Sequence, residues 1–361
     1  MSGRPMRVVI APDSFKGTVT ASGAAQALAD GWRSVRPDDH LTVRPMADGG
    51  EGTLSAVAAA HPGAALTRVG GCTGPDGRTV EGAYALLPDG TAVVELATAS
   101  GLPLMERPSP LTATTRGTGE TVAAALDGGA QGLLIALGGS ASTDGGTGLL
   151  HALGLRLLDV DGVPLPDGGG ALARAHRIDR SRLRAAPPKG VRLLTDVTNP
   201  LLGPSGAAAV YGPQKGAGPE DIALLERGLT RLSELLRTSP DQPGAGAAGG
   251  AAYGLMAIWG ATVTPGARAV ADLLGLDAAL ARADLVITGE GRFDATSLLG
   301  KVVGEVMTRA NRAGVPVHVV AGESPDPRPL TLVGLAGDPG DARARAAHWL
   351  RQAGAELARN R

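Results

Sequence analysis

The stretch Arg7-Val-Val-Ile-Ala-Pro-Asp-Ser-Phe-Lys-Gly17, near the start of the chain, decides the fold. An apolar run ends at a proline and a polar turn, and a helical pattern follows over residues 22–34. A short apolar run without alternation is typical of a strand that is buried on both faces, as in parallel sheets. We therefore predict a strand over residues 7–11, a polar loop at its carboxyl end, and then a helix.

The same order of apolar run, polar loop and helical pattern recurs along the chain. Further apolar runs cover residues 92–96, 132–137, 191–195, 284–288 and 315–321. Further helical patterns cover residues 119–126, 147–158, 219–236, 302–313 and 341–358. This alternation predicts an α/β fold with mostly parallel sheets and helices on both faces. In such folds ligands bind in the loops at the carboxyl ends of the strands.

The length of 361 residues favours two domains, since one domain takes roughly 150 residues. Both ends of the chain consist of simple strand–helix repeats, whereas the middle carries longer Gly-rich stretches. We predict a discontinuous first α/β domain of residues 1–70 plus 276–361, with a second α/β domain of residues 71–275 inserted into it.

Composition excludes several classes of protein. The formal net charge is -1 and aromatic residues make up 2%, so neither a basic field nor stacking platforms for nucleic acid are expected. The single cysteine, Cys72, fits a reducing compartment. No apolar run reaches the ~18–20 residues of a membrane span, and the N-terminus lacks a signal-peptide pattern. We expect a cytoplasmic protein with small-molecule partners.

Two loops near the N-terminus combine acidic side chains with glycine. In the loop of residues 11–17, Asp13 and Ser14 are candidates for substrate binding, and Lys16 is a point charge for an anion. In the loop of residues 46–53, Asp48 and Glu51 supply the hard oxygen ligands that Mg²⁺ prefers.

Glycine and hydroxyl groups dominate the candidate phosphate-binding loops. Their backbone N–H groups and hydroxyls suit a nucleotide or another phosphate. We predict such contacts from the loop of residues 138–146, from the turn lysine of Tyr211-Gly-Pro-Gln-Lys-Gly-Ala217 and from the G-x-G-x-x-G of residues 244–249. The predicted residues are Gly138, Gly139, Ser140, Thr143, Asp144, Lys215, Gly246 and Gly249.

Two later loops supply candidates for catalysis. Asp196 follows the run at 191–195 and is a plausible general base for a substrate hydroxyl. Asp196 and Asn199 are equally placed to hold Mg²⁺ or the substrate. Arg292 follows the run at 284–288 and is suited to grip a carboxylate or phosphate, with Glu290 and Asp294 beside it as substrate or metal ligands.

This mixture of groups suits phosphoryl transfer, in which catalysis is mostly positioning and charge neutralisation. The residues alone therefore indicate an α/β phosphotransferase or a phosphate-binding protein. A nicotinamide-dependent oxidoreductase would need a strand before the G-x-G-x-x-G of residues 244–249 and an acidic residue ~20 positions later. A non-catalytic ligand-binding regulator is the third possibility.

Eight motifs in order, which span nearly the whole chain, resemble the bacterial glycerate kinase family. They are IAPDSFKG (Ile10–Gly17), PMADGGEGT (Pro45–Thr53), TTRGTGE (Thr114–Glu120), GGSASTDGG (Gly138–Gly146), DVTNPLLGPSGAA (Asp196–Ala208), YGPQKGA (Tyr211–Ala217), GAGAAGG (Gly244–Gly250) and TGEGRFD (Thr288–Asp294).

The resemblance implies ATP-dependent phosphorylation of D-glycerate with Mg²⁺, and it favours 2-phosphoglycerate over 3-phosphoglycerate as the product. It also implies two α/β domains, the discontinuous one resembling a Rossmann or flavodoxin-like unit, with an active site in the cleft between them. On this interpretation Lys16 and Lys215 neutralise phosphate charge, Asp196 is the general base, and Arg292 binds the glycerate carboxylate. A kinase for another small hydroxy acid is the nearest alternative.

Overall fold

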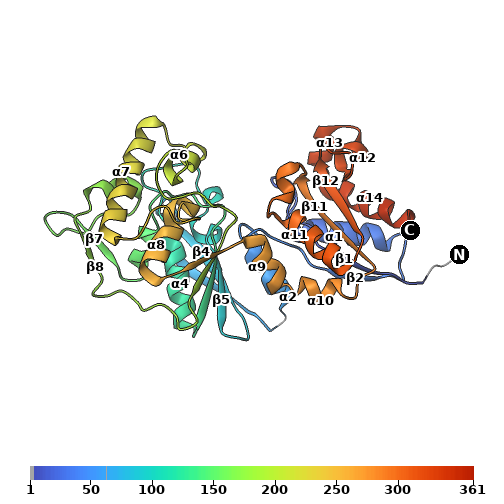
Figure 1. Ribbon diagram of the computed structural model, residues 1–361, viewed down its shortest axis with the longest axis horizontal. Coiled ribbons are helices and arrows are strands. Elements are labelled where there is room, and N and C mark those ends of the chain that lie inside the picture. Colours follow the sequence, from blue (N-terminus) through green and yellow to red (C-terminus); the bar gives the residue numbers. More distant parts are fainter. Residues whose placement is uncertain (1–3, 62) are drawn as a thin grey trace. The chain divides into compact units, whose positions relative to one another are not determined.

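The structure is a computed structural model that describes residues 4–61 and 63–361. The first three residues of the N-terminal segment, in which no targeting pattern is recognised, lie outside it. Contacts divide the chain into two compact units (Figure 1). The first unit consists of residues 4–48, 55–60 and 267–361. The second unit consists of Gly49–Leu54 and His61–Gly266.

The first unit contains a five-stranded parallel sheet. Its strands lie in the order β13-β12-β11-β1-β2. They are β1 (Arg7–Ile10), β2 (His40–Val43), β11 (Leu285–Arg292), β12 (Val317–Glu323) and β13 (Leu330–Thr331). Its helices are α1 (Ala21–Arg33), α9 (Gly266–Leu273), α10 (Leu276–Leu280), η5 (Ala295–Leu298), α11 (Val302–Ala313), α12 (Leu332–Ala336), α13 (Pro339–Ala344) and α14 (Ala346–Arg359), while α2 (Thr53–Ala60) belongs mostly to this unit.

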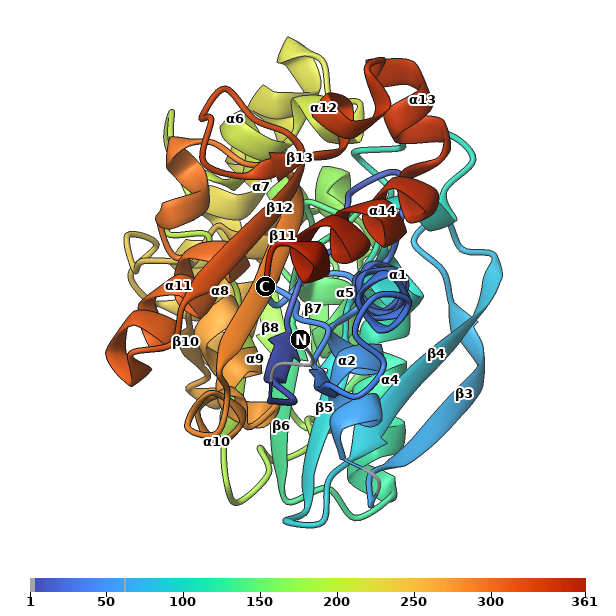
Figure 2. The same ribbon diagram turned by 90° about the vertical axis from the view of Figure 1, so that its right-hand side faces the viewer.

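Helices cover both faces of this sheet. Val320 packs into the core with α1 and α14, whereas its neighbour Ala321 packs with Val303 of α11. Successive side chains of a strand point to opposite faces, so α11 lies on the other face of the sheet from α1 and α14. Helices α1 and α14 run side by side (Figure 2). Gly31 and Gly354 permit this contact, because a Cβ at either would lie within 2.2 Å of the facing backbone.

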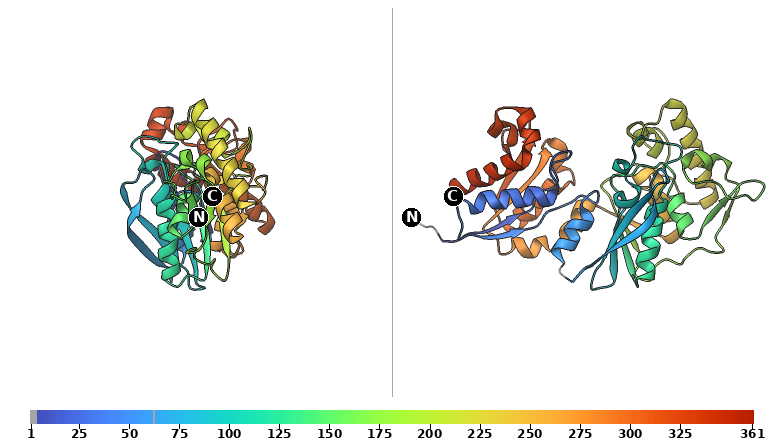
Figure 3. Two further views of the ribbon diagram at one scale, coloured as in Figure 1. Left: turned by 90° about the vertical axis from the view of Figure 1, so that its left-hand side faces the viewer. Right: turned by 180° about the vertical axis from the view of Figure 1, so that it is seen from behind.

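The second unit is built on a six-stranded mixed sheet. Its order is β10-β9-β6-β5-β4-β3, with β5, β6, β9 and β10 parallel and the long β3–β4 hairpin antiparallel at one edge (Figure 3). The strands are β3 (Ala65–Thr73), β4 (Thr79–Leu86), β5 (Thr91–Glu95), β6 (Gly132–Ala136), β9 (Val191–Leu194) and β10 (Thr262–Thr264), and a separate two-stranded sheet joins β7 (Arg156–Leu158) to β8 (Arg177–Asp179).

The helices of the second unit complete its core. They are α3 (Ala97–Ser100), η1 (Leu102–Leu104), α4 (Arg116–Asp127), α5 (Thr147–Ala152), η2 (Gly169–Arg174), α6 (Ala207–Tyr211), η3 (Pro213–Lys215), α7 (Pro219–Leu236), η4 (Ala247–Gly250) and α8 (Ala251–Trp259). Leucine, alanine and valine make up most of this core, and Tyr84 and Tyr253 are its buried aromatic residues in the described chain. None of the helices in the described part of the chain combines the length and apolarity that a membrane span requires.

The structure confirms the six predicted strands and the α/β class. Two predicted helices are wrong in part. The pattern of residues 147–158 begins as α5 but ends near Leu153, and Gly154 then turns the chain into β7 with a φ of +100°. A Cβ at Gly154 would lie 2.0 Å from the Arg182 carbonyl oxygen, so the turn requires glycine. The pattern of residues 341–358 divides into α13 and α14 at Arg345.

Candidate active site

A cavity of about 520 Å³ lies in the first unit, beside the loops that follow β1 and β11. Its volume falls in the range of sites for cofactors and drug-sized ligands, ~300–1,000 Å³. All seven residues of this unit that were predicted for catalysis, substrate binding or metal binding line it. They are Asp13, Ser14, Lys16, Asp48, Glu290, Arg292 and Asp294.

Backbone contacts fix the loop after β1. The N–H of Asp13 donates to the Gly289 carbonyl oxygen at 2.8 Å, which ties this loop to β11. Phe15 pairs with Val19 through backbone hydrogen bonds of 2.8 and 3.0 Å, and its ring is buried. Because Phe15 anchors the loop, its neighbours Ser14 and Lys16 line the cavity instead of packing into the core.

Glycines bring the β11 and β12 strand ends close together. A Cβ at Gly289 would lie 2.2 Å from the Val320 carbonyl oxygen, and one at Gly322 would lie 2.3 Å from the Gly291 carbonyl oxygen. The side chains that neighbour these glycines along the two strands carry charge. Arg292 is exposed and donates to Glu323 Oε1 at 3.1 Å, and its Nε lies 3.6 Å from Asp294 Oδ2. This arrangement leaves a guanidinium at the cavity wall, held by two carboxylates.

The carboxylates of this cavity are close enough to perturb one another. Burial, the nearby Asp48 carboxylate and Glu290 raise the pKa of Asp13 to about 7. Burial also raises the pKa of Glu290, and its buried Oε1 has no hydrogen-bond partner among the described residues. In contrast, hydrogen bonds from Thr296 hold the pKa of Asp294 below its ordinary value. A cation placed between Asp13 and Glu290 would relieve this repulsion.

A second cavity, of about 510 Å³, lies in the second unit at the ends of β6 and β9. Five of the predicted phosphate-binding residues and one predicted metal ligand line it. They are Gly138, Gly139, Ser140, Lys215, Gly249 and Glu51. The remaining predicted residues of this unit, Thr143, Asp144, Asp196, Asn199 and Gly246, are not among the described residues that line either cavity.

Lys215 is the buried cation of this second cavity. Its side chain comes from η3, and the residue is 2% exposed. Nζ donates to Ser140 Oγ at 2.8 Å and to the Ser142 carbonyl oxygen at 2.5 Å. Burial lowers the pKa of Lys215 to about 8, although the Asp144 carboxylate opposes that shift. The positive charge is therefore held against the loop of residues 138–146, where it is available to an anion.

Asp144 holds that loop in place from inside the protein. Its side chain is fully buried and accepts hydrogen bonds from the Thr115 N–H and hydroxyl at 2.9 and 2.8 Å, and from the N–H groups of Gly146 and Gly148 at 3.0 and 3.2 Å. Burial raises its pKa despite these bonds. Thr143 is also fully buried, and its hydroxyl has no partner among the described residues.

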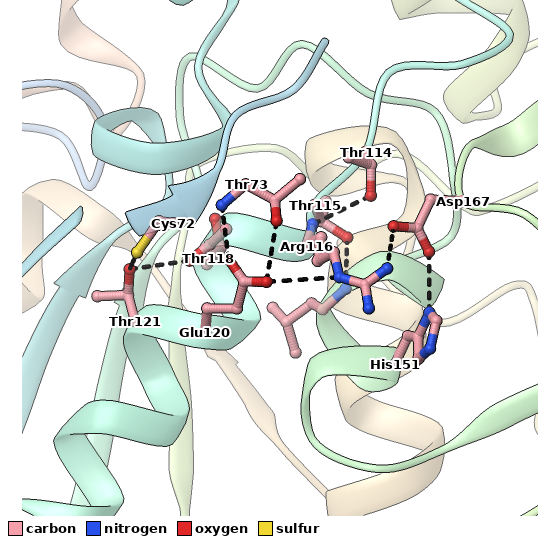
Figure 4. Close-up of polar contacts among 12 residues, drawn as sticks. Cys72, Thr73, Thr114, Thr115, Arg116, Thr118, Glu120, Thr121, His151 and Asp167 are labelled. Carbon is pink, nitrogen blue, oxygen red and sulfur yellow. Dashed lines mark hydrogen bonds and ion pairs between the residues drawn. The ribbon is translucent and has the colours of Figure 1, made fainter. Parts of the chain in front are cut away.

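The TTRGTGE segment connects this loop to its surroundings through a chain of polar contacts (Figure 4). Glu120 accepts from the Thr73 N–H at 2.6 Å and lies 3.4 Å from Arg116 Nε. Arg116 donates in turn to Asp167 at 2.8 Å, and His151 Nδ1 lies 2.9 Å from the other Asp167 oxygen. Burial acts to raise the pKa of Asp167, but the hydrogen bonds from His151 and Arg116 outweigh it and hold this pKa below its ordinary value. These residues support the fold around the N-terminus of α4.

The loop after β9 carries Asp196 and Asn199, which the sequence predicts as a general base and as a substrate or metal ligand. Asp196 is exposed, between the cavity-lining Thr195 and Val197, and its Oδ1 accepts from the Gly266 N–H at 2.8 Å. Asn199 donates to the Ser205 carbonyl oxygen and accepts from the Tyr211 hydroxyl, each at 2.8 Å. Both polar atoms of Asn199 are thus used within the loop.

The G-x-G-x-x-G of residues 244–249 lacks the setting of a dinucleotide fingerprint. Within the described chain, the residues that precede it form turns and not a strand. Gly246 is buried, and a Cβ there would lie 2.4 Å from the Pro200 carbonyl oxygen. A Cβ at Gly249 would lie 2.1 Å from the Ser142 carbonyl oxygen. These glycines therefore permit close packing against neighbouring loops.

Among the described residues, no group of three or more His, Cys, Asp and Glu side chains is arranged to hold a metal ion. Mg²⁺ commonly binds through one or two carboxylates together with substrate phosphates. The orphaned Glu290 oxygen and the repulsion around Asp13 suit such a partial site in the first cavity. Of the predicted metal ligands, Asp48 lines this cavity and Glu51 lines the other.

Four charged residues around these sites are not among the predicted site residues. Lys301, Glu323 and Arg343 line the first cavity. Lys301 follows a glycine and precedes a helix, which is a usable signal, whereas Glu323 and Arg343 reach the cavity through tertiary packing. Glu95 ends β5 and accepts from the N–H groups of Gly52 and Leu54 at 3.2 and 3.0 Å. It thereby caps the start of α2.

Comparisons with known proteins agree on one family. The model of the glycerate kinase family matches residues 8–337. Glycerate 2-kinase of Escherichia coli (strain K12) is 43% identical over 330 residues, which are 89% of this chain and 86% of that protein. Glycerate kinase of Bacillus subtilis (strain 168) is 42% identical over 329 residues, 88% of this chain and 85% of that protein.

A solved structure agrees with the sequence relatives. A crystal structure that carries the name glycerate kinase 2, from Salmonella typhimurium LT2, superposes with a TM-score of 0.82 at 39% sequence identity. The match covers 99% of this chain and 98% of that chain. The motifs that line the two cavities lie within the matched residues. The chain therefore belongs to the glycerate kinase family, a family of phosphotransferases.

Proposed function

We propose that this protein transfers the terminal phosphoryl group of ATP to the 2-hydroxyl of D-glycerate and releases 2-phosphoglycerate and ADP. The observation that carries the proposal is the 43% identity to a protein named glycerate 2-kinase across 89% of the chain. The family match over residues 8–337 includes the loops at the carboxyl ends of β1, β6, β9 and β11, where ligands bind in α/β folds.

The chemistry of the two cavities supports phosphoryl transfer. Such transfer needs in-line positioning and compensation of phosphate charge more than covalent chemistry by the protein. Lys16 lines the first cavity and the buried Lys215 lines the second, so each unit offers a cation to an anionic substrate. Mg²⁺ would supply further neutralisation of the phosphate oxygens, and Asp13, Asp48 and Glu290 are the carboxylates of the first cavity suited to hold it.

A carboxylate is also needed to accept the proton of the attacking hydroxyl. We assign this role to Asp196, which is exposed at the end of β9 beside the second cavity. Its hydrogen bond from the Gly266 N–H fixes one oxygen, so the carboxylate has a defined orientation. A general base must come within hydrogen-bond reach of the proton that it abstracts, and apo geometry is often looser than the reactive complex.

The proposed reaction is tested by coupled measurement of ADP release with D-glycerate, ATP and Mg²⁺, with phosphorus NMR of the product. We expect rapid, Mg²⁺-dependent release and the signal of 2-phosphoglycerate. A 3-phosphoglycerate signal would overturn the regiochemistry alone. Release with another small hydroxy acid but not with D-glycerate would replace the acceptor, and the absence of turnover with every acid would favour a non-catalytic binding protein.

A further inference from the structure

The strand order of the first unit contains a topological switch point. From β1, the chain places β2 on one side and then β11, β12 and β13 on the other. The loops that follow β1 and β11 therefore turn away toward opposite faces and leave a crevice at the carboxyl edge of the sheet. Ligands of open α/β sheets, nucleotides among them, bind in such crevices. The cavity of about 520 Å³ is lined by these two loops.

Part of the lining of this cavity is apolar. Leu332 and Val333 of α12, Ala342 of α13 and Ala346 of α14 form it. Leu332, Ala342 and Ala346 are buried members of the core cluster of the unit, and Val333 is half-buried against them. Glycerate carries oxygen on every carbon and offers little apolar surface to such a wall. A purine base does, since its faces are apolar.

The rest of the lining includes many charged side chains. Four of them are basic: Lys16, Arg292, Lys301 and Arg343. Lys301 Nζ donates to Thr296 Oγ1 at 3.0 Å, and Arg292 and Arg343 share the Glu323 carboxylate at 3.1 and 3.8 Å. In the second cavity, Lys215 is the one basic side chain among the described lining residues. The lining of the first cavity also carries five carboxylates, whereas the described lining of the second cavity has one basic and one acidic side chain. A triphosphate with its Mg²⁺ brings several charges of both signs and a hydroxy acid brings one, so the first cavity suits the nucleotide better.

Carboxylates stand beside these cations. Asp13, Asp48 and Glu290 line the same cavity, and the buried Glu290 Oε1 has no hydrogen-bond partner among the described residues. Mg²⁺ bound to a nucleotide keeps its phosphates as ligands and takes only one or two carboxylates from the protein. The mixture of cations and carboxylates is thus suited to a magnesium–nucleotide complex.

We propose that the cavity of the first unit is the nucleotide site, with the purine against Leu332 and Val333 and the phosphates among Lys16, Arg292 and Lys301. The inference rests on the proposed function, which makes ATP the phosphoryl donor. It moves the nucleotide away from the loop of residues 138–146, where sequence reasoning put it. It also assigns Arg292 to the phosphates and not to the glycerate carboxylate.

The test is the affinity of the whole protein for magnesium–ADP, measured by titration calorimetry without turnover. The Val333→Trp variant places a bulky ring on the apolar part of the cavity lining, and we expect its dissociation constant for ADP to rise about tenfold or more. The matched control is Val197→Trp, at a half-buried valine of the second cavity, which we expect to leave ADP affinity unchanged. Circular dichroism checks that both variants fold.

A second measurement keeps the inference open to refutation if Val333→Trp does not fold. Photolabelling of the wild-type protein with 8-azido-ADP and peptide mapping should mark residues 330–346. Labelling of residues 195–215 or 248–249 would overturn the inference, as would unchanged ADP affinity in folded Val333→Trp or no binding of ADP to the wild type. ADP binding weakened by Val333→Trp, in a protein that does not phosphorylate D-glycerate, would leave the site intact and refute the proposed reaction.

Discussion

At the scale of single residues, burial of charge distinguishes the groups suited to chemistry. Lys215 is 2% exposed and close to the buried Asp144, whereas most other basic side chains lie at the surface. Asp13 has a pKa of about 7 because it is buried beside Asp48 and Glu290. Perturbed groups of this kind concentrate at functional sites, because structural needs alone rarely place unneutralised charge in a cavity.

The pH dependence of turnover should report on Lys215. Since burial lowers its pKa to about 8, the ammonium loses its proton as the pH rises through this value. We expect kcat/KM to fall about tenfold per pH unit above pH 8, and Lys215→Arg to remove this fall, because arginine stays protonated. The pH profiles of both proteins test the prediction. An identical alkaline fall in Lys215→Arg would assign the titration to another group.

The lowered pKa of Lys215 also makes the free energy of unfolding depend on pH. Between pH 8 and 10.5 the unfolded chain holds the Lys215 proton that the folded protein has released. The contribution of this group to the free energy of unfolding therefore rises with pH across that window. Urea titrations of the wild type and of Lys215→Met, at both ends of the window, measure the difference.

Replacement of Asp196 tests the assignment of the general base. Asp196→Asn keeps an oxygen for the Gly266 N–H but removes the basicity. We expect kcat to fall ~10²–10⁴-fold with little change in the melting temperature. The control is Asp161→Asn, at an exposed aspartate of the β7–β8 region, which should have wild-type kinetics. Turnover of Asp196→Asn within a factor of about two of wild type would refute the role.

At the scale of elements, buried hydrogen bonds decide how the glycine-rich loops are held. Thr115, at the start of α4, donates its hydroxyl to Asp144 at 2.8 Å and accepts from the Leu149 N–H at 2.9 Å. Thr115→Val removes this bridge between α4 and α5, takes one of four hydrogen bonds from the buried Asp144 carboxylate and takes the hydroxyl acceptor from the Leu149 N–H. We expect the free energy of unfolding to fall by ~1–3 kcal/mol in urea titrations. Thr79→Val, on the exposed side of β4, is the control and should be nearly neutral.

Arg309 provides the corresponding test in the first unit. Its side chain in α11 is 5% exposed and lies 2.6–3.1 Å from the carboxylates of Asp272, Asp277 and Glu305. Arg309→Met removes the charge that joins α9 and α10 to α11. Because Asp272 and Asp277 are mostly solvated, we expect a loss of ~1–3 kcal/mol, below the value for fully buried pairs. Arg33→Met, whose pair with Asp30 is at 3.9 Å and exposed, is the control, and equal losses would contradict the prediction.

The sequence predicted an element correctly where a single periodicity of apolar residues extends along the whole segment. The helices at 219–236 and 302–313 have the predicted bounds, because apolar residues recur at helical spacing without interruption. The prediction failed at residues 147–158, where Gly154 ends the helix, and it missed the β3–β4 hairpin, whose residues 65–73 are largely exposed and alternate irregularly. A local pattern does not record which partner strand a segment will meet.

At the scale of the whole molecule, each unit has a large hydrophobic core of its own. One cluster is formed by the second unit, and another by β1, α1, β11, β12 and α14 of the first. The predicted domain boundaries at residues 70 and 276 stay a prediction, because they refer to domains that fold independently. If each core melts as its own cooperative unit, calorimetry should show two transitions. A single transition with equal calorimetric and van't Hoff enthalpies would contradict it.

The sequence by itself determined the α/β class, the six buried strands and the polar loops at their carboxyl ends, because apolar runs and glycine punctuation are local signals. It also indicated phosphoryl transfer through eight ordered motifs. Only the tertiary structure decided which of those polar residues share a cavity. Asp13, Glu290 and Arg292 come together because β1 and β11 pair in register although about 275 residues separate them. In contrast, Asp144 is hydrogen-bonded to Thr115 and to its own loop, and Asn199 to Ser205 and Tyr211. Strand pairing over such distances depends on the packing of the entire unit, and no local pattern encodes it.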